Sequence, residues 1–224
     1  MQKKSVISDI EVLGSLPVRV DYILLEDRFS SHKSPKKKIF DLKKKGYLRQ
    51  IKRGQYFNLK SKHMETTAYE IVANSLYFPS YISMEWALQY YGLIMDRVAT
   101  VTSVTLLRSK DFKTPYAPFS YKHLTKNRYP IGYISKVIKP NESFLIARPE
   151  KALIDYVNIR AKNLAIKKES DIQEFLEDDL RLDLPEFLKN IKSSELDELL
   201  PFYHRNSKEY RILKWLIHRK GNKS

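Results

Sequence analysis

A short helix is the best-defined element that the sequence predicts, because signals mark both of its ends. Ser34 is a favourable N-cap residue, and Pro35 suits the first helical position because its missing N–H would have no partner there. Gly46 is typical of the position just past a helix. These signals predict a helix over residues 35–45.

The predicted helix is followed by a hairpin and preceded by further helices. Residues 47–52 and 55–59 are two β-prone runs, and the glycine at position 54 favours a tight turn between them. In residues 8–25, apolar side chains recur at helical spacing with an interruption, which predicts two helices. Three helices followed by a hairpin is the order of a winged helix-turn-helix, which we predict for residues 1–62.

Positive charge is concentrated in this predicted domain. The chain carries a net charge of +15, with a sequence pI near 9.7. Residues 1–62 hold sixteen Lys and Arg against six Asp and Glu, so two thirds of the excess falls in little more than a quarter of the chain. Such a distribution indicates a polyanionic partner for the first domain.

The predicted helix places its lysines away from its apolar side. On a helical wheel, Ile39 and Leu42 fall on one side, and roughly opposite lie Lys37, Asp41, Lys44 and Lys45. A helix fits the major groove of B-DNA, where lysines bind phosphates and arginine or glutamine can read bases in a bidentate manner. The candidate DNA-binding residues are Lys36, Lys37, Lys43, Lys44, Lys45, Arg49, Lys52, Arg53 and Gln55.

Other interpretations remain open for the same residues. A lysine-rich helix is commonly a solvated surface, or a basic face that binds RNA or an acidic protein. We expect Phe40, Tyr47 and Tyr56 to support the hairpin as apolar residues rather than to stack on bases. The last helix, basic with an apolar stripe, is an equally open candidate for a second nucleic-acid or partner surface.

The pattern of residues 63–224 predicts a second domain, with a mixture of helices and antiparallel strands. The predicted fold class of the chain is therefore α+β. Helical patterns occur first, strand-like runs rich in Val and Thr follow, and residues 148–150 start another helix. We expect the sheet to extend to about residue 160 and the chain to be helical after residue 165. The predicted strands are near residues 98–107, 112, 119–123, 132–138 and 143–146.

The sequence indicates no enzyme. The five histidines are scattered, the six glycines form no phosphate-binding loop, and no serine lies in a glycine-flanked elbow. A nuclease is the third possibility, but Glu150 and Lys151 lack the intervening residue of the usual acidic motif, and Lys151 with Asp155 has the spacing of an i, i+4 ion pair. We therefore expect no catalytic residues, metal or cofactor.

The chain has no cysteine, which excludes disulfides and thiolate metal sites. Its first residues do not have the pattern of a signal peptide, and no apolar run is long enough to span a membrane. These features predict a cytoplasmic protein with no membrane partner, and they leave its oligomeric state open.

Several segments in a fixed order resemble the AbiEi family, the antitoxins of type IV toxin–antitoxin (abortive infection) systems. The resemblance covers about residues 35–160. It consists of Gly46-Tyr47-Leu48 with Arg53-Gly54-x-Tyr56, Pro79-Ser80-Tyr81-Ile82-Ser83 with Ala87-Leu88 and Tyr91-Gly92-Leu93-Ile94, Val101-Thr102-Ser103-Val104-Thr105, Phe119-x-Tyr121-x-His123-Leu124, and Ala147-x-Pro149-Glu150-Lys151-Ala152-Leu153-x-Asp155. The helices before residue 35 match the family poorly.

This resemblance implies a function in two parts. The first domain would repress its own operon by binding operator repeats in duplex DNA. The second domain, residues 63–224, would neutralise a nucleotidyltransferase-like toxin without forming a stable complex with it.

Overall fold

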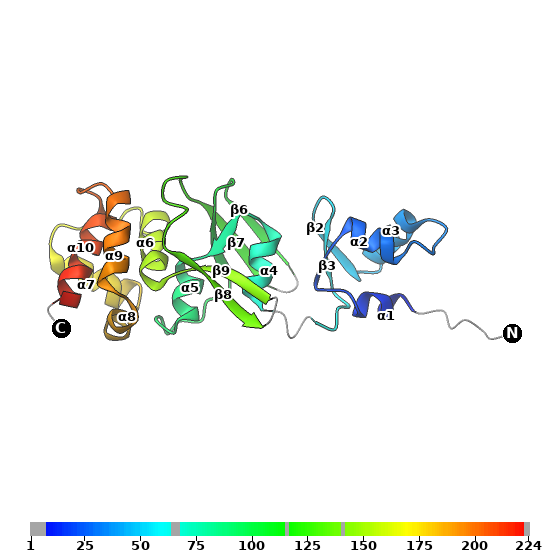
Figure 1. Cartoon of the computed structure of the whole chain (residues 1–224), viewed down its shortest axis with the longest axis horizontal. Helices are drawn as coiled ribbons and strands as arrows, with labels where there is room; N and C mark the ends of the chain where they lie inside the picture. Colours follow the sequence, from blue (N-terminus) through cyan, green and yellow to red (C-terminus); the bar gives the residue numbers. More distant parts are fainter. Residues whose placement is uncertain (1–7, 64–67, 115–116, 140–141, 222–224) are drawn as a thin grey trace. The chain divides into compact units, whose positions relative to one another are not determined.

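The computed structural model describes residues 8–63, 68–114, 117–139 and 142–221. Contacts within the chain divide it into two compact units, Met1–Ala68 and Tyr69–Ser224, whereas the sequence placed the division after residue 62. Both units contain helices and strands, so the protein is mixed α and β (Figure 1). Each unit is described by itself below.

The first unit combines helices with a small antiparallel sheet. Its elements are α1 (Asp9–Gly14), β1 (Arg19–Asp21), α2 (Tyr22–Arg28), α3 (Pro35–Lys44), β2 (Leu48–Lys52) and β3 (Gln55–Asn58). The strand order is β1-β3-β2, and both pairings are antiparallel. The expected helices and hairpin are present, but the sequence did not predict β1, because three residues are too few to show alternation.

The ends of α3 follow the signals in its sequence. The Ser34 hydroxyl accepts a hydrogen bond from the Lys37 backbone N–H at 3.4 Å, as an N-cap residue does. Gly46, with a φ of +70°, follows the end of the helix, and Gly54, with a φ of +75°, turns the hairpin. Both glycines adopt a backbone conformation that costs other residues free energy, which explains why the local signals predicted these turns correctly.

The core of the first unit joins all three helices to the sheet. Its buried residues are Leu13, Leu16, Val20, Leu25, Phe29, Ile39, Leu42, Leu48 and Tyr56. Asn58, at the end of the hairpin, is fully buried and donates a side-chain hydrogen bond to the Leu13 carbonyl at 2.6 Å. The Ser61 hydroxyl donates to the Leu16 carbonyl at 2.7 Å. These bonds satisfy carbonyls in the last turn of α1 and in the segment that leads to β1, and they attach this part of the chain to the hairpin.

The second unit contains a six-stranded mixed sheet in the order β6-β7-β5-β4-β9-β8. Its strands are β4 (Ser80–Ile82), β5 (Val101–Thr105), β6 (Lys110–Lys113), β7 (Pro118–His123), β8 (Tyr133–Lys139) and β9 (Glu142–Ala147). The pairs β5–β7 and β4–β9 are parallel, and the other three neighbouring pairs are antiparallel. The sequence predicted every strand except β4, which again has only three residues. The prediction of antiparallel strands holds for three of the five pairings and was wrong for β5–β7 and β4–β9, because strand direction depends on how distant segments pair.

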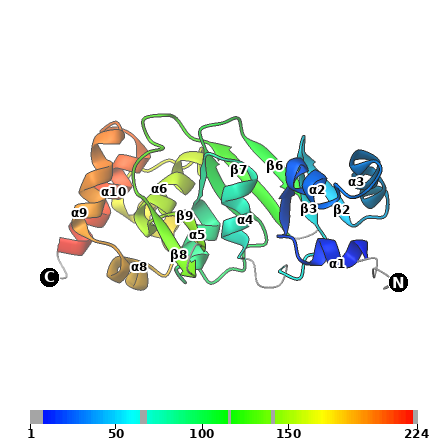
Figure 2. The same cartoon turned by 45° about the vertical axis from the view of Figure 1, so that its right-hand side comes forward.

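Helices complete the second unit. They are α4 (Tyr69–Leu76), α5 (Met84–Tyr90), α6 (Pro149–Ile159), α7 (Glu169–Glu174), the π-helical turn η1 (Phe175–Asp179), α8 (Leu184–Asn190), α9 (Ser193–Leu199), the 3-10 turn η2 (Leu200–Phe202) and α10 (Lys208–Gly221). Figure 2 shows α6 between the sheet and the helices α9 and α10, and α6 contacts β9, α9 and α10. The predicted helical region after residue 165 is present. No helix among the described residues has the length and apolar character needed to cross a lipid bilayer.

Candidate nucleic-acid interface

The outward face of α3 carries exposed cations over a buried apolar side. Ile39 and Leu42 are 2% and 1% exposed and pack into the core of the first unit. Lys36, Lys37 and Lys44 are exposed. The core therefore determines which side of the helix faces solvent. Lys37 and Lys44 lie outside the core as the wheel predicted, and Lys36, which the wheel placed on the flank, is exposed as well.

Two of the predicted lysines have partners within the protein. Lys43 is half-buried, and its ammonium donates a hydrogen bond to the Gln50 side-chain carbonyl at 2.7 Å, which links α3 to β2. Lys45 is exposed, but its Nζ lies 3.8 Å from the Asp9 carboxylate. Lys43 is therefore a poorer phosphate ligand than Lys37 or Lys44, because binding a phosphate would compete with the bond to Gln50.

Three candidate residues of the hairpin, Arg49, Arg53 and Gln55, differ in how accessible their side chains are to a base. Arg49 and Arg53 are exposed, so their guanidinium groups are accessible. Gln55 is half-buried, and its side-chain carbonyl oxygen is buried without a hydrogen-bond partner among the described residues. A buried amide is badly placed to reach a base edge. Lys52 belongs to β2, but its side chain lies outside the part of the chain that the structure describes.

Phe40 does not support the hairpin, and that expectation was wrong. Its side chain is 51% exposed on the outward face of α3, and the Lys44 ammonium lies 4.9 Å from the centre of its ring. Tyr56 is buried at 6% exposure and Tyr47 packs against the core, as expected. The sequence could have located Phe40, since the wheel that places Ile39 and Leu42 inside also places residue 40 outside.

Asp9 of α1 pairs with a second lysine besides Lys45, and the sequence predicted neither pair. The Lys38 ammonium lies 2.6 Å from the Asp9 carboxylate of α1, and both side chains are 21% exposed. Lys38 therefore fixes α3 against α1 instead of adding to the outward charge. Local sequence could not show this pair, because its members are 29 positions apart and meet only through packing of the two helices.

In the second unit, motif residues of the family resemblance form a buried polar cluster. The Asp155 carboxylate accepts hydrogen bonds from the Ser83 hydroxyl at 2.7 Å and the Tyr81 hydroxyl at 3.1 Å, and it pairs with Lys151. Burial first, then the Asp155 charge, raises the pKa of Tyr81 well above its ordinary value. Ser83 precedes α5 but makes no side-chain cap bond there. These four residues are buried, so they hold the sheet, α5 and α6 together and present no accessible reactive group.

A second carboxylate at the start of α6 is also buried. Glu150 is 0% exposed and accepts a hydrogen bond from the Arg148 Nε at 2.7 Å, and Arg148 Nη2 also lies 2.5 Å from the Glu198 carboxylate of α9. Burial raises the pKa of Glu150 to about 7, although its own backbone N–H and the charge of Arg148 act in the opposite direction. This group connects α6 with α9.

The described residues contain no group of three or more His, Asp or Glu side chains placed to hold a metal ion. Comparison with protein-family models and with curated protein sequences finds no match to this chain.

Proposed function

We propose that the first unit is a winged helix-turn-helix that binds duplex DNA through α3, with the β2–β3 hairpin as its wing. The observation that supports this most directly is the outward face of α3, where Lys36, Lys37 and Lys44 are exposed over buried Ile39 and Leu42. The element order and the β1-β3-β2 sheet also support this proposal, because a winged helix requires three helices followed by a hairpin.

The dimensions of α3 suit this role. An α-helix with its side chains is about 10–12 Å in diameter, which fits the width of the major groove of B-DNA, about 12 Å. Lysines on the outward face would contact phosphates and release counterions, which gives affinity without sequence preference. Arg49 and Arg53, exposed on the hairpin, would supply bidentate contacts to bases or phosphates.

We further propose that the chain is a cytoplasmic transcriptional repressor of its own operon and the antitoxin of a type IV toxin–antitoxin system. The support for this is the order of the motifs that resemble the AbiEi family. The motifs in the second unit contain the residues of the buried cluster around Asp155. In this proposal they stabilise a domain whose surface would neutralise a nucleotidyltransferase-like toxin.

Binding to three labelled probes tests the DNA proposal: a duplex from the chain's own promoter, a scrambled duplex of equal length, and a single strand. Fluorescence anisotropy over a series of salt concentrations gives the affinity and its salt slope for each. We expect the promoter duplex to bind most tightly, with a steep slope for both duplexes. Equal affinity for all three probes would contradict operator recognition.

Two further assays separate the alternatives. Tighter binding to structured RNA than to either duplex would favour an RNA-binding module, and cleavage of labelled DNA with magnesium or manganese would favour a nuclease. For the antitoxin proposal, the chain is co-expressed with a nucleotidyltransferase reading frame from the same operon. Continued growth arrest in the presence of the folded chain would contradict that part of the proposal while leaving DNA binding intact.

A further inference from the structure

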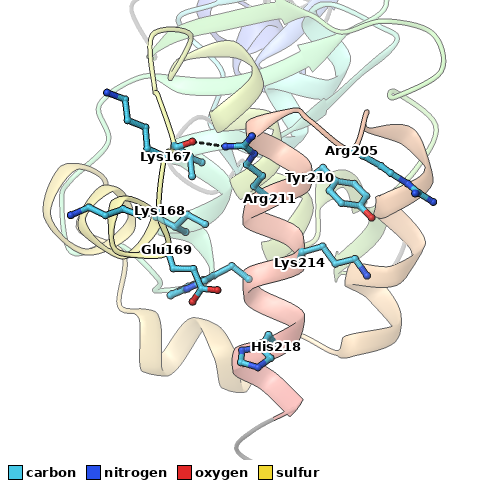
Figure 3. Close-up of a pocket in the computed structure, with 11 residues that line it drawn as sticks. Lys167, Lys168, Glu169, Arg205, Tyr210, Arg211, Lys214 and His218 are labelled. Carbon is cyan, nitrogen blue, oxygen red and sulfur yellow. Dashed lines mark hydrogen bonds between the residues drawn. The ribbon is translucent and has the colours of Figure 1, made fainter.

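A basic pocket lies in the second unit between α10 and the segment that enters α7 (Figure 3). It has a volume of about 420 Å³, which is within the range of pockets that hold small molecules. Lys167, Lys168 and Glu169 line it from the α7 side, and Arg205, Arg211 and Lys214 from α10 and the residues before it. Among the described residues that line the pocket, five Lys and Arg side chains are cationic and one Glu side chain is a carboxylate.

The carboxylates near these cations, Glu169 in the pocket and Asp171 beside Lys167 and Lys168, are fewer than the cations. Lys167, Lys168, Arg205, Arg211 and Lys214 form no salt bridge within the described ranges. Arg211 donates to the Ile166 carbonyl at 2.6 Å, a neutral acceptor that orients the guanidinium and leaves its charge (Figure 3). The Asp171 carboxylate accepts the backbone N–H groups of Lys167 and Lys168 and does not line the pocket.

Two aromatic side chains line the same pocket. Trp215 is 4% exposed, and its indole N–H is buried without an acceptor among the described residues. The Arg219 guanidinium lies 4.7 Å from the centre of the Trp215 ring. Tyr210, half-buried at the pocket, offers a ring against which a flat group can stack. Because the indole N–H is buried, Trp215 contributes part of its ring to the pocket wall and no accessible donor.

From these features we infer that the pocket binds a phosphorylated nucleotide, either free or at the end of a single-stranded nucleic acid. Arg205, Arg211 and Lys214 supply positive charge for the phosphate, and Tyr210 supplies a stacking surface for the base, whereas the Lys167 and Lys168 side chains extend away from α10 (Figure 3). A pocket of this size does not enclose a double helix, and a phosphate on a peptide would leave the aromatic surface unused. The inference does not depend on duplex binding by α3.

The test uses the tryptophan indole resonances of the full chain, because the sequence has only two tryptophans, Trp86 and Trp215. The ¹H–¹⁵N signal of Trp215, assigned with a Trp86→Phe variant, is followed during titration with adenosine and uridine monophosphates, adenosine, inorganic phosphate, and a short 5′-phosphorylated oligonucleotide. We expect the nucleotides or the oligonucleotide to move the Trp215 signal and to leave Trp86 unchanged. Tighter binding of the oligonucleotide would identify a strand end as the source, and tighter binding of the free nucleotides would identify a small ligand.

A matched pair of variants locates the binding. Lys214→Glu, in the pocket, should weaken nucleotide binding about tenfold. Lys126→Glu changes the charge equally at an exposed turn outside the pocket and should weaken it less than about twofold. Three results would overturn the inference: no movement of the Trp215 signal with any nucleotide probe, equal binding of inorganic phosphate and nucleotide, or equal loss in both variants. Displacement of the nucleotide by a phosphoserine peptide of higher affinity would assign the pocket to a peptide instead.

Discussion

Lys151 and Asp155 form an ion pair inside α6, with the ammonium nitrogen 2.5 Å from one carboxylate oxygen and both side chains fully buried. Their i, i+4 spacing indicated a pair, but a pair on a solvated helix surface contributes little, whereas a buried charge that loses its partner is costly. Gly132 makes room for this pair: its φ is +72°, and a Cβ there would lie 2.8 Å from the Lys151 Cβ. The interior of the second unit therefore contains a pair of opposite charges.

Replacing only one member of this pair should destabilise the second unit strongly. Asp155→Ala leaves the Lys151 ammonium buried without its carboxylate, and we expect the free energy of unfolding to fall by about 3–5 kcal/mol. Urea unfolding followed by circular dichroism measures the change. The double variant Lys151→Met with Asp155→Asn keeps an acceptor for Ser83 and Tyr81 and removes both charges, so it should cost less. Equal losses in the two variants would contradict this account.

The stability of the second unit should depend on the protonation of Glu150. Its pKa in the folded protein, about 7, lies above the ordinary value of 4.5, so the folded state holds the proton more tightly than the unfolded state. Protonated Glu150 therefore contributes most to the free energy of unfolding below about pH 4.5, by roughly 3 kcal/mol at most. This contribution is lost as the pH rises to about 7.

Glu150→Gln should remove this part of the pH dependence. Urea unfolding at about pH 5 and about pH 8 gives the difference in stability for the wild type and the variant. Glu198→Gln is the matched control, since Glu198 also pairs with Arg148 but has a side chain that is 48% exposed. If wild type and Glu150→Gln lose the same stability between the two pH values, Glu150 is not the group that titrates.

The exposed lysines of α3 should control the affinity for all duplexes. Lys37→Ala with Lys44→Ala removes two cations that have no carboxylate partner within the described part of the chain, so the salt slope should fall by about two. Replacing Lys189 and Lys192, exposed on the second unit, is the control and should leave the slope unchanged. Arg53→Ala should instead weaken binding most on the preferred site. Unchanged binding in the α3 and Arg53 variants would place the DNA surface elsewhere.

Phe40 should contribute to sequence preference rather than to general affinity. It lies half exposed among the outward lysines of α3, where an apolar ring can contact a thymine methyl group. Phe40→Ala should therefore reduce the ratio of promoter to scrambled binding by about tenfold and leave the salt slope as in the wild type. Anisotropy measures both quantities, and thermal unfolding checks the fold. A large loss of stability would instead mean that Phe40 supports the core.

The sequence by itself determined the elements whose signals are local. Ser34 and Pro35 start α3 because a cap and a fixed φ act within one turn, and Gly46 and Gly54 mark turns because they tolerate a positive φ. The inward position of Ile39 and Leu42 also followed from helical spacing alone. The exposed basic face of α3 was therefore predictable before any tertiary contact was known.

Only the tertiary structure decided the features that depend on distant partners. The strands β1 and β4 have three residues each and exist through pairing with β3, β5 and β9. Ser83 directly precedes α5, where a serine commonly caps a helix, but its hydroxyl donates to Asp155, 72 positions away. Lys43 was a DNA-binding candidate like Lys37, yet packing brings it to Gln50, and packing also brings Lys38 to Asp9. The use of a charged or polar side chain depends on which groups folding brings beside it, and no local pattern contains that information.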